Sequence, residues 1–228
     1  MNVQIWSDIN CPFCYIGKRK FEKALAGFDH KDKVDVEWRS FQLDPDLKMI
    51  PGKSIHQYLA DRKGITLEKA REMNDFMTNN AKEVGLTYNF DTAILNNSLD
   101  AHRLLHLAKK HGLQNDTKEA LFKAYYTNGL DIGDHHTLTD IGTSVGIPKE
   151  EISAMLDSDL FKEEVEADQS MARQVGASGV PFFVFNNKYA VSGAQPTDLF
   201  AEVLNKVWQE EVPAIAEGAV CGPDGVCD

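Results

Sequence analysis

The first forty residues carry two different hydrophobic periods. Residues 2–6 form a short, mainly apolar run that predicts a strand. A helix that begins near Cys11 and buries one face is predicted by the spacing i, i+3, i+4 and i+7 of Phe21, Ala24, Leu25 and Phe28. Over residues 33–38, apolar and charged residues alternate, which predicts a half-exposed strand. This part of the chain therefore predicts a β-α-β unit with a cysteine pair at its strand-to-helix junction.

From about residue 44 to residue 158 the pattern is helical throughout. Apolar residues recur at helical spacing in four stretches, with glycines between several of them. The stretches contain Ile55, Tyr58 and Leu59; Leu67, Ala70, Met73 and Met77; Ala101, Leu104, Leu105 and Ala108; and Leu121, Ala124 and Tyr125. Because this block shows no strand pattern, we expect an all-helical insertion.

The last part of the chain returns to strands. A helical stripe covers residues 161–175, and another helix is expected over 197–208. Between them, the apolar runs 182–185 and 188–191 flank a two-residue asparagine link, which predicts a β-hairpin. Residues 211–228 show no periodicity.

Joined in order, these pieces spell β-α-β, a helical insertion, and α-β-β-α. This is the order of an α/β protein with the thioredoxin fold, interrupted by a large all-helical insertion after the second strand. We expect a discontinuous thioredoxin-like domain of residues 1–44 and 159–210, an insertion domain of residues 45–158, and a C-terminal tail, residues 211–228. At about 150 residues per domain, the length of 228 residues fits one large or two small domains.

Composition and charge limit the partners and the cellular compartment that we expect for this protein. The chain is 43% hydrophobic, enough for a real core, and its 35 acidic and 24 basic residues give a formal net charge of −11. This charge argues against a nucleic-acid or membrane partner, since each needs a clustered basic surface. No apolar run approaches the ~20 residues of a membrane span, and residues 1–6 lack the features of a signal peptide. We therefore expect a cytoplasmic protein, in which close cysteine pairs are more often catalytic, redox-sensing or metal-binding than structural.

The segment Cys11-Pro12-Phe13-Cys14 carries the strongest chemical signal. A thiolate is the nucleophile of disulfide exchange, and a helix N-terminus favours this anion through free N–H groups and the helix dipole. Pro12 suits the first helical position, and Cys14 lies one turn along, within reach of a mixed disulfide on Cys11. We expect Cys11 to attack and Cys14 to resolve, with Pro12 and Phe13 at the substrate. Two buried structural cysteines or half of a zinc site are the alternatives; since no other nearby pair has ligand spacing, we expect no metal.

Val180-Pro181 is the second signal. A proline at the start of a strand has no N–H to donate to the sheet. It therefore destabilises the strand there unless the fold requires its backbone geometry. In a thioredoxin fold this position holds a cis-proline that faces the CxxC. We therefore expect a cis peptide bond, with Pro181 in the catalytic site and the Val180 backbone available to an extended substrate. An ordinary trans proline at a strand start is the alternative.

Three segments resemble one known family. Residues 7–18, 97–106 and 179–196 look like the DsbA-like thioredoxin superfamily, specifically its FrnE-type cytoplasmic branch. The resemblance spans residues 2–209 and implies thiol–disulfide oxidoreductase activity, with Cys11 attacking, Cys14 resolving and Pro181 in the cis position. The superfamily also includes 2-hydroxychromene-2-carboxylate isomerases and kappa-class glutathione transferases. Those typically have serine at the position of Cys11 and use glutathione without a CxxC redox cycle.

Other candidate residues are less specific. Cys221 and Cys227 flank a turn sequence, Gly-Pro-Asp-Gly, and form either a second redox pair, a local disulfide, or two free thiols. His102 and His106 have the spacing of two metal ligands on a helix, but the residues between them lack the glutamate of a zinc-protease motif. We expect these two histidines to be packed or hydrogen-bonded. Asp8 is either a proton acceptor for the buried cysteine or a helix-entry residue.

Three functions fit these observations. The leading hypothesis is a cytoplasmic thiol–disulfide oxidoreductase, a reductase or isomerase of protein or small disulfides, with no tightly bound cofactor and with glutathione as a co-substrate. The second is a glutathione-dependent isomerase or transferase of aromatic substrates. The third is a redox-sensing, chaperone-like binding protein. The sequence leaves the oligomeric state open.

Overall fold

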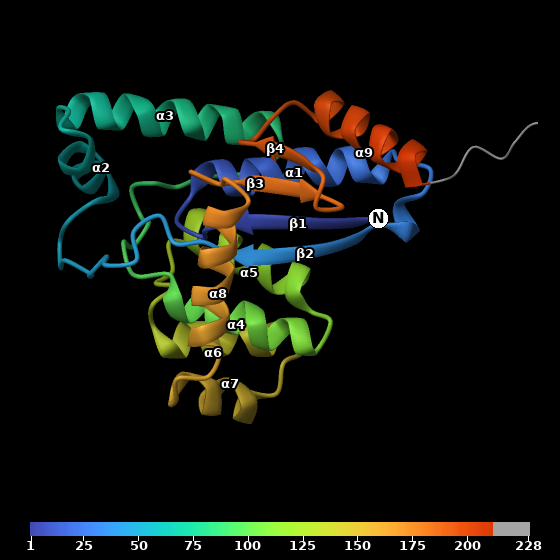
Figure 1. Cartoon of the computed structure of the whole chain (residues 1–228). Helices are drawn as coiled ribbons and strands as arrows, with labels where there is room; N and C mark the ends of the chain where they lie inside the picture. The colour runs from blue at the N-terminus through green and yellow to red at the C-terminus, as the bar shows by residue number, and fades with distance from the viewer. Residues whose placement is uncertain (212–228) are drawn as a thin grey trace, which may run out of the picture.

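A four-stranded sheet organises the molecule. The computed structural model describes residues 1–211 and orders the strands β2-β1-β3-β4 (Figure 1). The strands are β1 (Asn2–Ser7), β2 (Asp35–Ser40), β3 (Phe182–Phe185) and β4 (Tyr189–Ser192). Strands β1 and β2 are parallel, joined by the crossover helix α1 (Pro12–Ala26), while β3 pairs antiparallel with β1 and β4. Asn186 and Asn187 form the hairpin link with φ values of 49° and 55°, as a tight turn between twisted strands requires.

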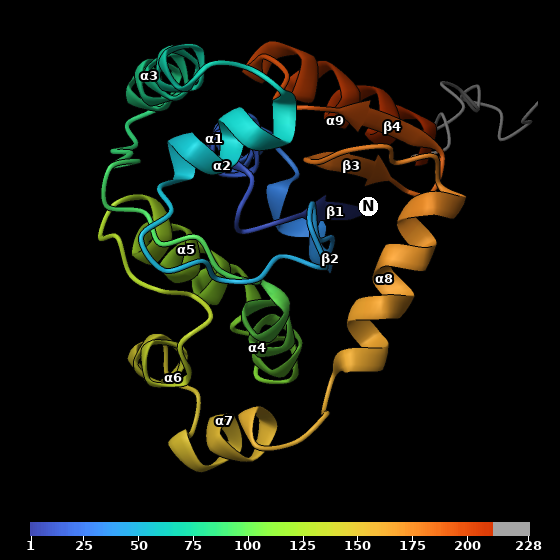
Figure 2. The same ribbon diagram turned by 90° about the vertical axis from the view of Figure 1, so that its left-hand side faces the viewer.

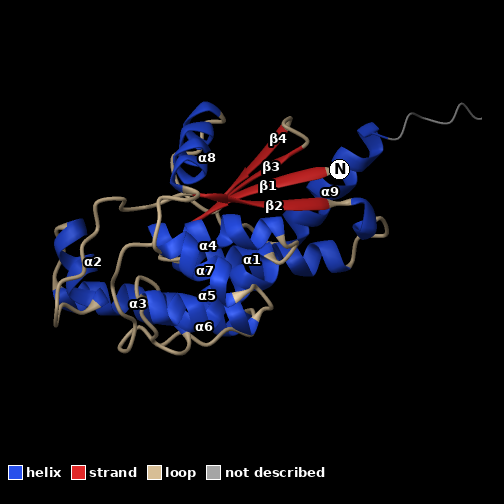
Figure 3. Cartoon of the chain, turned by 90° about the horizontal axis from the view of Figure 1, so that it is seen from below, coloured by secondary structure: helices blue, strands red, loops and turns tan. Residues whose placement is uncertain are grey.

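Helices cover both faces of this sheet (Figure 3). Helices α1 and α9 (Thr197–Glu211) pack on one face, where Phe21, Phe183 and Phe200 meet with ring centroids 4.7 to 5.7 Å apart. Helix α8 (Lys162–Gln174) packs on the other face, where the Trp6 indole Nε1 donates to the Asp168 carbonyl oxygen at 2.8 Å. This arrangement is the thioredoxin fold predicted from the order of the elements.

Six helices between β2 and α8 form the insertion. They are α2 (Ile55–Lys63), α3 (Leu67–Glu83), α4 (Leu99–Lys110), α5 (Gln114–Tyr126), α6 (His135–Ser144) and α7 (Lys149–Leu156). Helices α4 to α7 pack together, while α2 and α3 pack on each other, with α3 also against α1 (Figures 1 and 2). All six fall within residues 45–158, and the domain limits at those residues remain a prediction. No helix of the described part of the chain is both long and apolar enough to cross a bilayer.

The insertion and the first turn of α1 share one hydrophobic core. Cys11, Cys14, Tyr15 and Ile16 all pack in the cluster that contains the apolar faces of α4 and α5. The Tyr15 ring stacks on Phe122 of α5 with centroids 4.7 Å apart. The cysteine pair therefore sits where the insertion meets the sheet domain.

Candidate active site

Cys11 and Cys14 occupy the start of α1. Cys11 is the N-cap residue, with φ −95° and ψ 110°, and Pro12 follows in the first helical turn. The Cys14 N–H donates to the Cys11 carbonyl oxygen at 3.0 Å, which places the second thiol one turn along. Both residues are free cysteines, and both are buried, with 3% and 0% of their surface exposed. Phe13, between them, is 47% exposed.

Val180 and Pro181 face this cysteine pair. Their peptide bond is cis, which confirms that expectation. The Cys11 thiol donates to the Val180 carbonyl oxygen at 3.3 Å. Helix α1 approaches the loop so closely that a Cβ atom at Gly17 would lie 2.9 Å from Pro181 Cγ. The predicted segments are thus brought together, while the roles of Pro12, Phe13, Val180 and Pro181 at a substrate remain predictions.

A buried acid lies directly before the motif. Asp8 is 1% exposed, accepts the Leu43 N–H at 2.7 Å, and lies 3.3 Å from His102 Nε2. Burial raises the pKa of Asp8, but the hydrogen bond and charge of His102 and the bonds from Leu43 and Ser98 outweigh it, so that the pKa falls below its usual value. Burial lowers the pKa of His102. Asp8 is therefore an ionised group beneath the cysteines.

A buried lysine faces the same region. Lys118 of α5 is fully buried, with its Nζ atom 3.5 Å from the Ser7 carbonyl oxygen and 4.9 Å from the Phe122 ring centre. Burial lowers the pKa of Lys118 to about 8, although the negative charges of Cys14, Asp8 and Cys11 act in the opposite direction. The sequence analysis did not identify this residue. Its signal is the helical spacing i, i+3, i+4, i+7 of Lys118 with Leu121, Phe122 and Tyr125, which places a charge on a buried face.

The Cys11 thiol is not the low-pKa group that its helix N-terminus predicts. Its hydrogen bond with Cys14, its burial, and the negative charges of Cys14 and Asp8 raise its pKa well above the usual range. The helix dipole is outweighed because the thiol is enclosed and lies beside two groups of negative charge. The Cys11 thiol is therefore protonated in this enclosed geometry.

The histidines are hydrogen-bonded rather than grouped, as expected. His106 Nε2 lies 3.1 Å from Ser40 Oγ and 3.2 Å from Asp168 Oδ2, away from the Asp8 partner of His102. Within residues 1–211 there is no group of three or more histidine, cysteine, aspartate or glutamate side chains arranged to hold a metal ion. Cys221 and Cys227 lie outside the described residues, so a second redox pair, a local disulfide and two free thiols all stay open for them.

Comparison with known proteins extends these observations. The family model of the DSBA-like thioredoxin domain matches residues 2–205. A crystal structure described as a probable DsbA oxidoreductase from Streptomyces coelicolor is 39% identical, with a TM-score of 0.88, and the match covers 100% of this chain and 98% of that chain. The cytosolic disulfide reductase DsbM from Pseudomonas aeruginosa, solved with GSH, shares the fold at 15% identity and a TM-score of 0.65, over 91% of this chain and 100% of that chain.

Among curated proteins, the uncharacterized protein YwbO of Bacillus subtilis (strain 168) is 24% identical over 207 residues. That match covers 90% of this chain and 96% of YwbO. Sequence, fold and these matches agree along nearly the whole length of the chain. The chain therefore belongs to the DSBA-like thioredoxin domain family.

Proposed function

We propose that the chain is a thiol–disulfide oxidoreductase that reduces or isomerises disulfides through Cys11 and Cys14. The observation that carries the proposal is the position of Cys11 Sγ at the start of α1, 3.3 Å from the Val180 carbonyl oxygen. The nucleophile therefore lies beside a main-chain oxygen that can accept a hydrogen bond from an extended substrate.

The first step is attack by the Cys11 thiolate on a substrate disulfide. A bond forms between Cys11 Sγ and one substrate sulfur, the substrate S–S bond breaks, and the departing thiolate takes up a proton. A substrate N–H that donates to the Val180 oxygen replaces the Cys11 thiol there, and so removes one contact that holds the proton on Cys11. Substrate binding and activation of the nucleophile are thereby coupled.

In the second step Cys14 resolves the mixed disulfide. Its thiolate attacks Cys11 Sγ, the Cys11–Cys14 disulfide forms, and the second substrate thiol leaves. The Lys118 ammonium group favours negative charge at both cysteines. Two glutathione molecules then restore the dithiol and leave as oxidised glutathione; the fold shared with DsbM, which was solved with GSH, supports this choice of reductant.

The setting belongs to the same proposal. We place the activity in the cytoplasm and the chain in the FrnE-type branch, with disulfide-containing proteins as substrates. A glutathione-reduced compartment keeps the resting enzyme as a dithiol, which favours reduction and isomerisation over net oxidation. The half-exposed Phe13 ring offers an apolar contact to an extended substrate beside the nucleophile.

Two serine variants test the assignment. Cys14→Ser should accumulate a mixed disulfide on Cys11 with a disulfide-linked peptide, detected by mass spectrometry after acid quenching. Cys11→Ser should keep the fold by circular dichroism and lose at least about a thousandfold in reduction rate, because the nucleophile is gone. Undiminished reduction by Cys11→Ser would contradict the proposal. Full turnover by Cys14→Ser would instead indicate glutathione-dependent chemistry without a CxxC cycle.

A further inference from the structure

A tyrosine between α3 and α4 holds the main chain between the two cysteines. The Tyr88 hydroxyl donates to the Pro12 carbonyl oxygen at 2.7 Å. The Tyr88 ring is 3% exposed and stacks on Tyr126 of α5 with centroids 4.4 Å apart. Burial, together with the negative charges of Cys11 and Cys14, raises the pKa of Tyr88, so its hydroxyl keeps its proton and stays a donor. Tyr88 therefore anchors one main-chain group of the motif from 76 residues along the chain.

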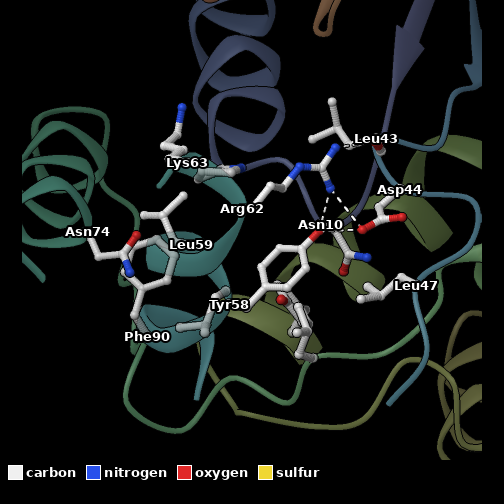
Figure 4. A pocket seen from close by; sticks show the side chains of 14 residues that line it. Asn10, Leu43, Asp44, Leu47, Tyr58, Leu59, Arg62, Lys63, Asn74 and Phe90 are labelled. Carbon is white, nitrogen blue, oxygen red and sulfur yellow. Dashed lines mark hydrogen bonds and ion pairs between the residues drawn. The ribbon is translucent and has the colours of Figure 1, made fainter. Parts of the chain in front are cut away.

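Side-chain packing restrains this part of the motif weakly. Pro12 and Asn10 form part of the wall of a cavity of about 280 Å³ that lies beside the motif (Figure 4). Much of the remaining wall is apolar, including Leu47, Leu59, Phe90 and Leu95. The Phe13 side chain is half exposed to solvent. Because the cavity adjoins Pro12 and solvent adjoins Phe13, the orientation of the peptide between them depends on the hydrogen bond from Tyr88.

This orientation matters for the charge on Cys11. Cys11 is the N-cap residue of α1, and an N-cap side chain accepts from the N–H of the second or third helical residue, here Phe13 or Cys14. The Pro12–Phe13 peptide is planar and trans, so a hydrogen bond that fixes its oxygen also fixes the direction of its N–H. The Cys11 thiol donates to Val180 and makes no cap hydrogen bond. A thiolate has no proton to donate, and it is stabilised by N–H donors instead.

Charged groups from several elements face Cys11. The hydrogen bond with the Cys14 thiol, burial, and the negative charges of Cys14 and Asp8 raise the pKa of Cys11, while the Cys14 N–H lowers it. The Lys118 ammonium group of α5 favours negative charge at both cysteines. All of these groups stay in place when the Tyr88 hydroxyl alone is removed. A change in the titration of Cys11 then reports on that hydroxyl.

We propose that Tyr88 is a positioning residue for the nucleophile of this motif. Its hydrogen bond holds the Pro12–Phe13 peptide so that the Phe13 N–H donates to the Cys11 thiolate. When Cys11 loses its proton, its sulfur no longer donates to the Val180 oxygen and accepts from this N–H instead. Tyr88 thus acts through the main chain. The inference rests on the proposed function, because it concerns the nucleophile of that reaction.

Alkylation of Cys11 by iodoacetamide at a series of pH values tests the inference without turnover, because the thiolate is the reactive form. Each sample is quenched with acid, and the modified Cys11 is quantified by mass spectrometry. Tyr88→Phe keeps the ring stack and loses the hydrogen bond to Pro12. The thiolate fraction at a given pH should therefore fall about tenfold, which moves the midpoint about one pH unit higher. An unchanged midpoint would overturn the role of Tyr88.

Tyr126→Phe is the matched control. Tyr126 is as buried as Tyr88 and stacks on it, and within residues 1–211 its hydroxyl has no hydrogen-bond partner. Burial raises the pKa of Tyr126, and the negative charges of the two cysteines raise it further, as they do for Tyr88. The control should leave the Cys11 midpoint in place, and melting curves should show both variants folded. Equal displacement in both variants would contradict the proposal, since the effect would then come from ring packing.

A signal from the wild-type protein makes the test independent of any variant. The amide resonance of Phe13 is followed by NMR as the pH rises. It should shift with the same midpoint as the alkylation of Cys11, because the N–H gains a negatively charged acceptor. A Phe13 amide that does not respond while Cys11 ionises would overturn the proposal.

The rate of reduction of a disulfide-linked peptide separates this inference from the proposed function. Tyr88→Phe should reduce the peptide about threefold more slowly at pH 7, because a tenfold smaller thiolate fraction is partly offset by the greater nucleophilicity of a more basic thiolate. A wild-type rate in Tyr88→Phe would contradict the positioning role and leave the proposed function standing. No reduction by the wild-type protein would overturn the proposed function, while the alkylation and the NMR titration would still decide the role of Tyr88.

Discussion

The molecule contains two buried regions that differ in their content of charged and unpaired polar groups. On the α1 and α9 face of the sheet, the core is aromatic and aliphatic, centred on Phe21, Phe183 and Phe200. The core beneath the cysteines contains the ionised Asp8 and the buried Lys118. Within residues 1–211, several buried side-chain polar atoms have no hydrogen-bond partner. Apart from Arg39 Nε, they belong to Ser7, Asn10, His102, Tyr125 and Tyr126.

This difference separates the part of the chain that stabilises the fold from the part that supports chemistry. A fully apolar core gains stability from burial alone, whereas an unpaired buried group costs about 1 to 3 kcal/mol and persists where something else requires it. The costly groups gather around α4, α5 and the segment before Cys11. Substitutions in the two regions should therefore change stability and activity in different combinations.

The largest stability change is expected in the sheet core. Phe200→Ala should lower the free energy of unfolding by about 3 to 5 kcal/mol, because it removes a fully buried ring and leaves a cavity between Phe21 and Phe183. Urea unfolding measures the loss. The reduction rate per folded molecule should stay the same. A loss of the reduction rate without a loss of stability would contradict the proposed separation between the stabilising region and the chemical region.

Lys118→Met should act in opposite directions on stability and activity. With a pKa of about 8 in the folded protein against about 10.4 in an unfolded chain, the buried ammonium group destabilises the fold by about 3 kcal/mol at pH 7. Between pH 8 and 10.4 the unfolded chain binds more protons, so wild-type stability rises with pH relative to the variant. Urea unfolding at pH 7 and at pH 10 should show the variant more stable at pH 7 and the difference shrinking at pH 10.

The same variant should reduce disulfides more slowly at neutral pH. Removal of the positive charge disfavours thiolates at Cys11 and Cys14, so the acidic limb of the pH–rate profile should move to higher pH. A variant with wild-type rates and an unchanged profile would show that Lys118 is only a buried structural residue.

A smaller effect is expected at the contact between α1 and the cis-proline loop. Gly17→Ala should destabilise by about 1 to 3 kcal/mol, because the new Cβ meets Pro181 Cγ at 2.9 Å and the loop must shift from Cys11. The rate of disulfide reduction should fall together with the stability. Gly27→Ala is the control, since its Cβ meets nothing closer than 3.7 Å at an ordinary negative φ. Equal behaviour of the two variants would show that the position of Pro181 does not matter to the rate.

Much of the fold follows from local patterns in the sequence. The strand periods, the helix at Cys11 and the asparagine link of the hairpin depend on neighbouring residues, and the structure confirms them. Asp134 caps α6, and His135 and His136 begin that helix. Helix α7 buries Ile152, Met155 and Leu156 at the spacing i, i+3 and i+4, a pattern that the sequence analysis did not single out.

The environment of the cysteines could not be predicted in the same way. Lys118 reaches Ser7, and Asp8 reaches His102, across about a hundred residues of chain, through packing of the insertion on the sheet domain. The raised pKa of Cys11 results from its hydrogen bond with Cys14 and from this enclosure, and not from its helix. The cavity beside Asn10 is likewise assembled from α2, α5 and the segment at Phe90, and no single stretch of sequence indicates it.

Redox titration of the cysteines tests the central claim most directly. The protein is equilibrated across glutathione buffers, quenched with acid, and each cysteine is mapped by mass spectrometry. The account predicts a reversible two-electron transition at Cys11–Cys14, at about −200 to −270 mV, and the same map shows whether Cys221 and Cys227 titrate with it. A pair that stays reduced or oxidised across the whole range would contradict a redox role for the motif.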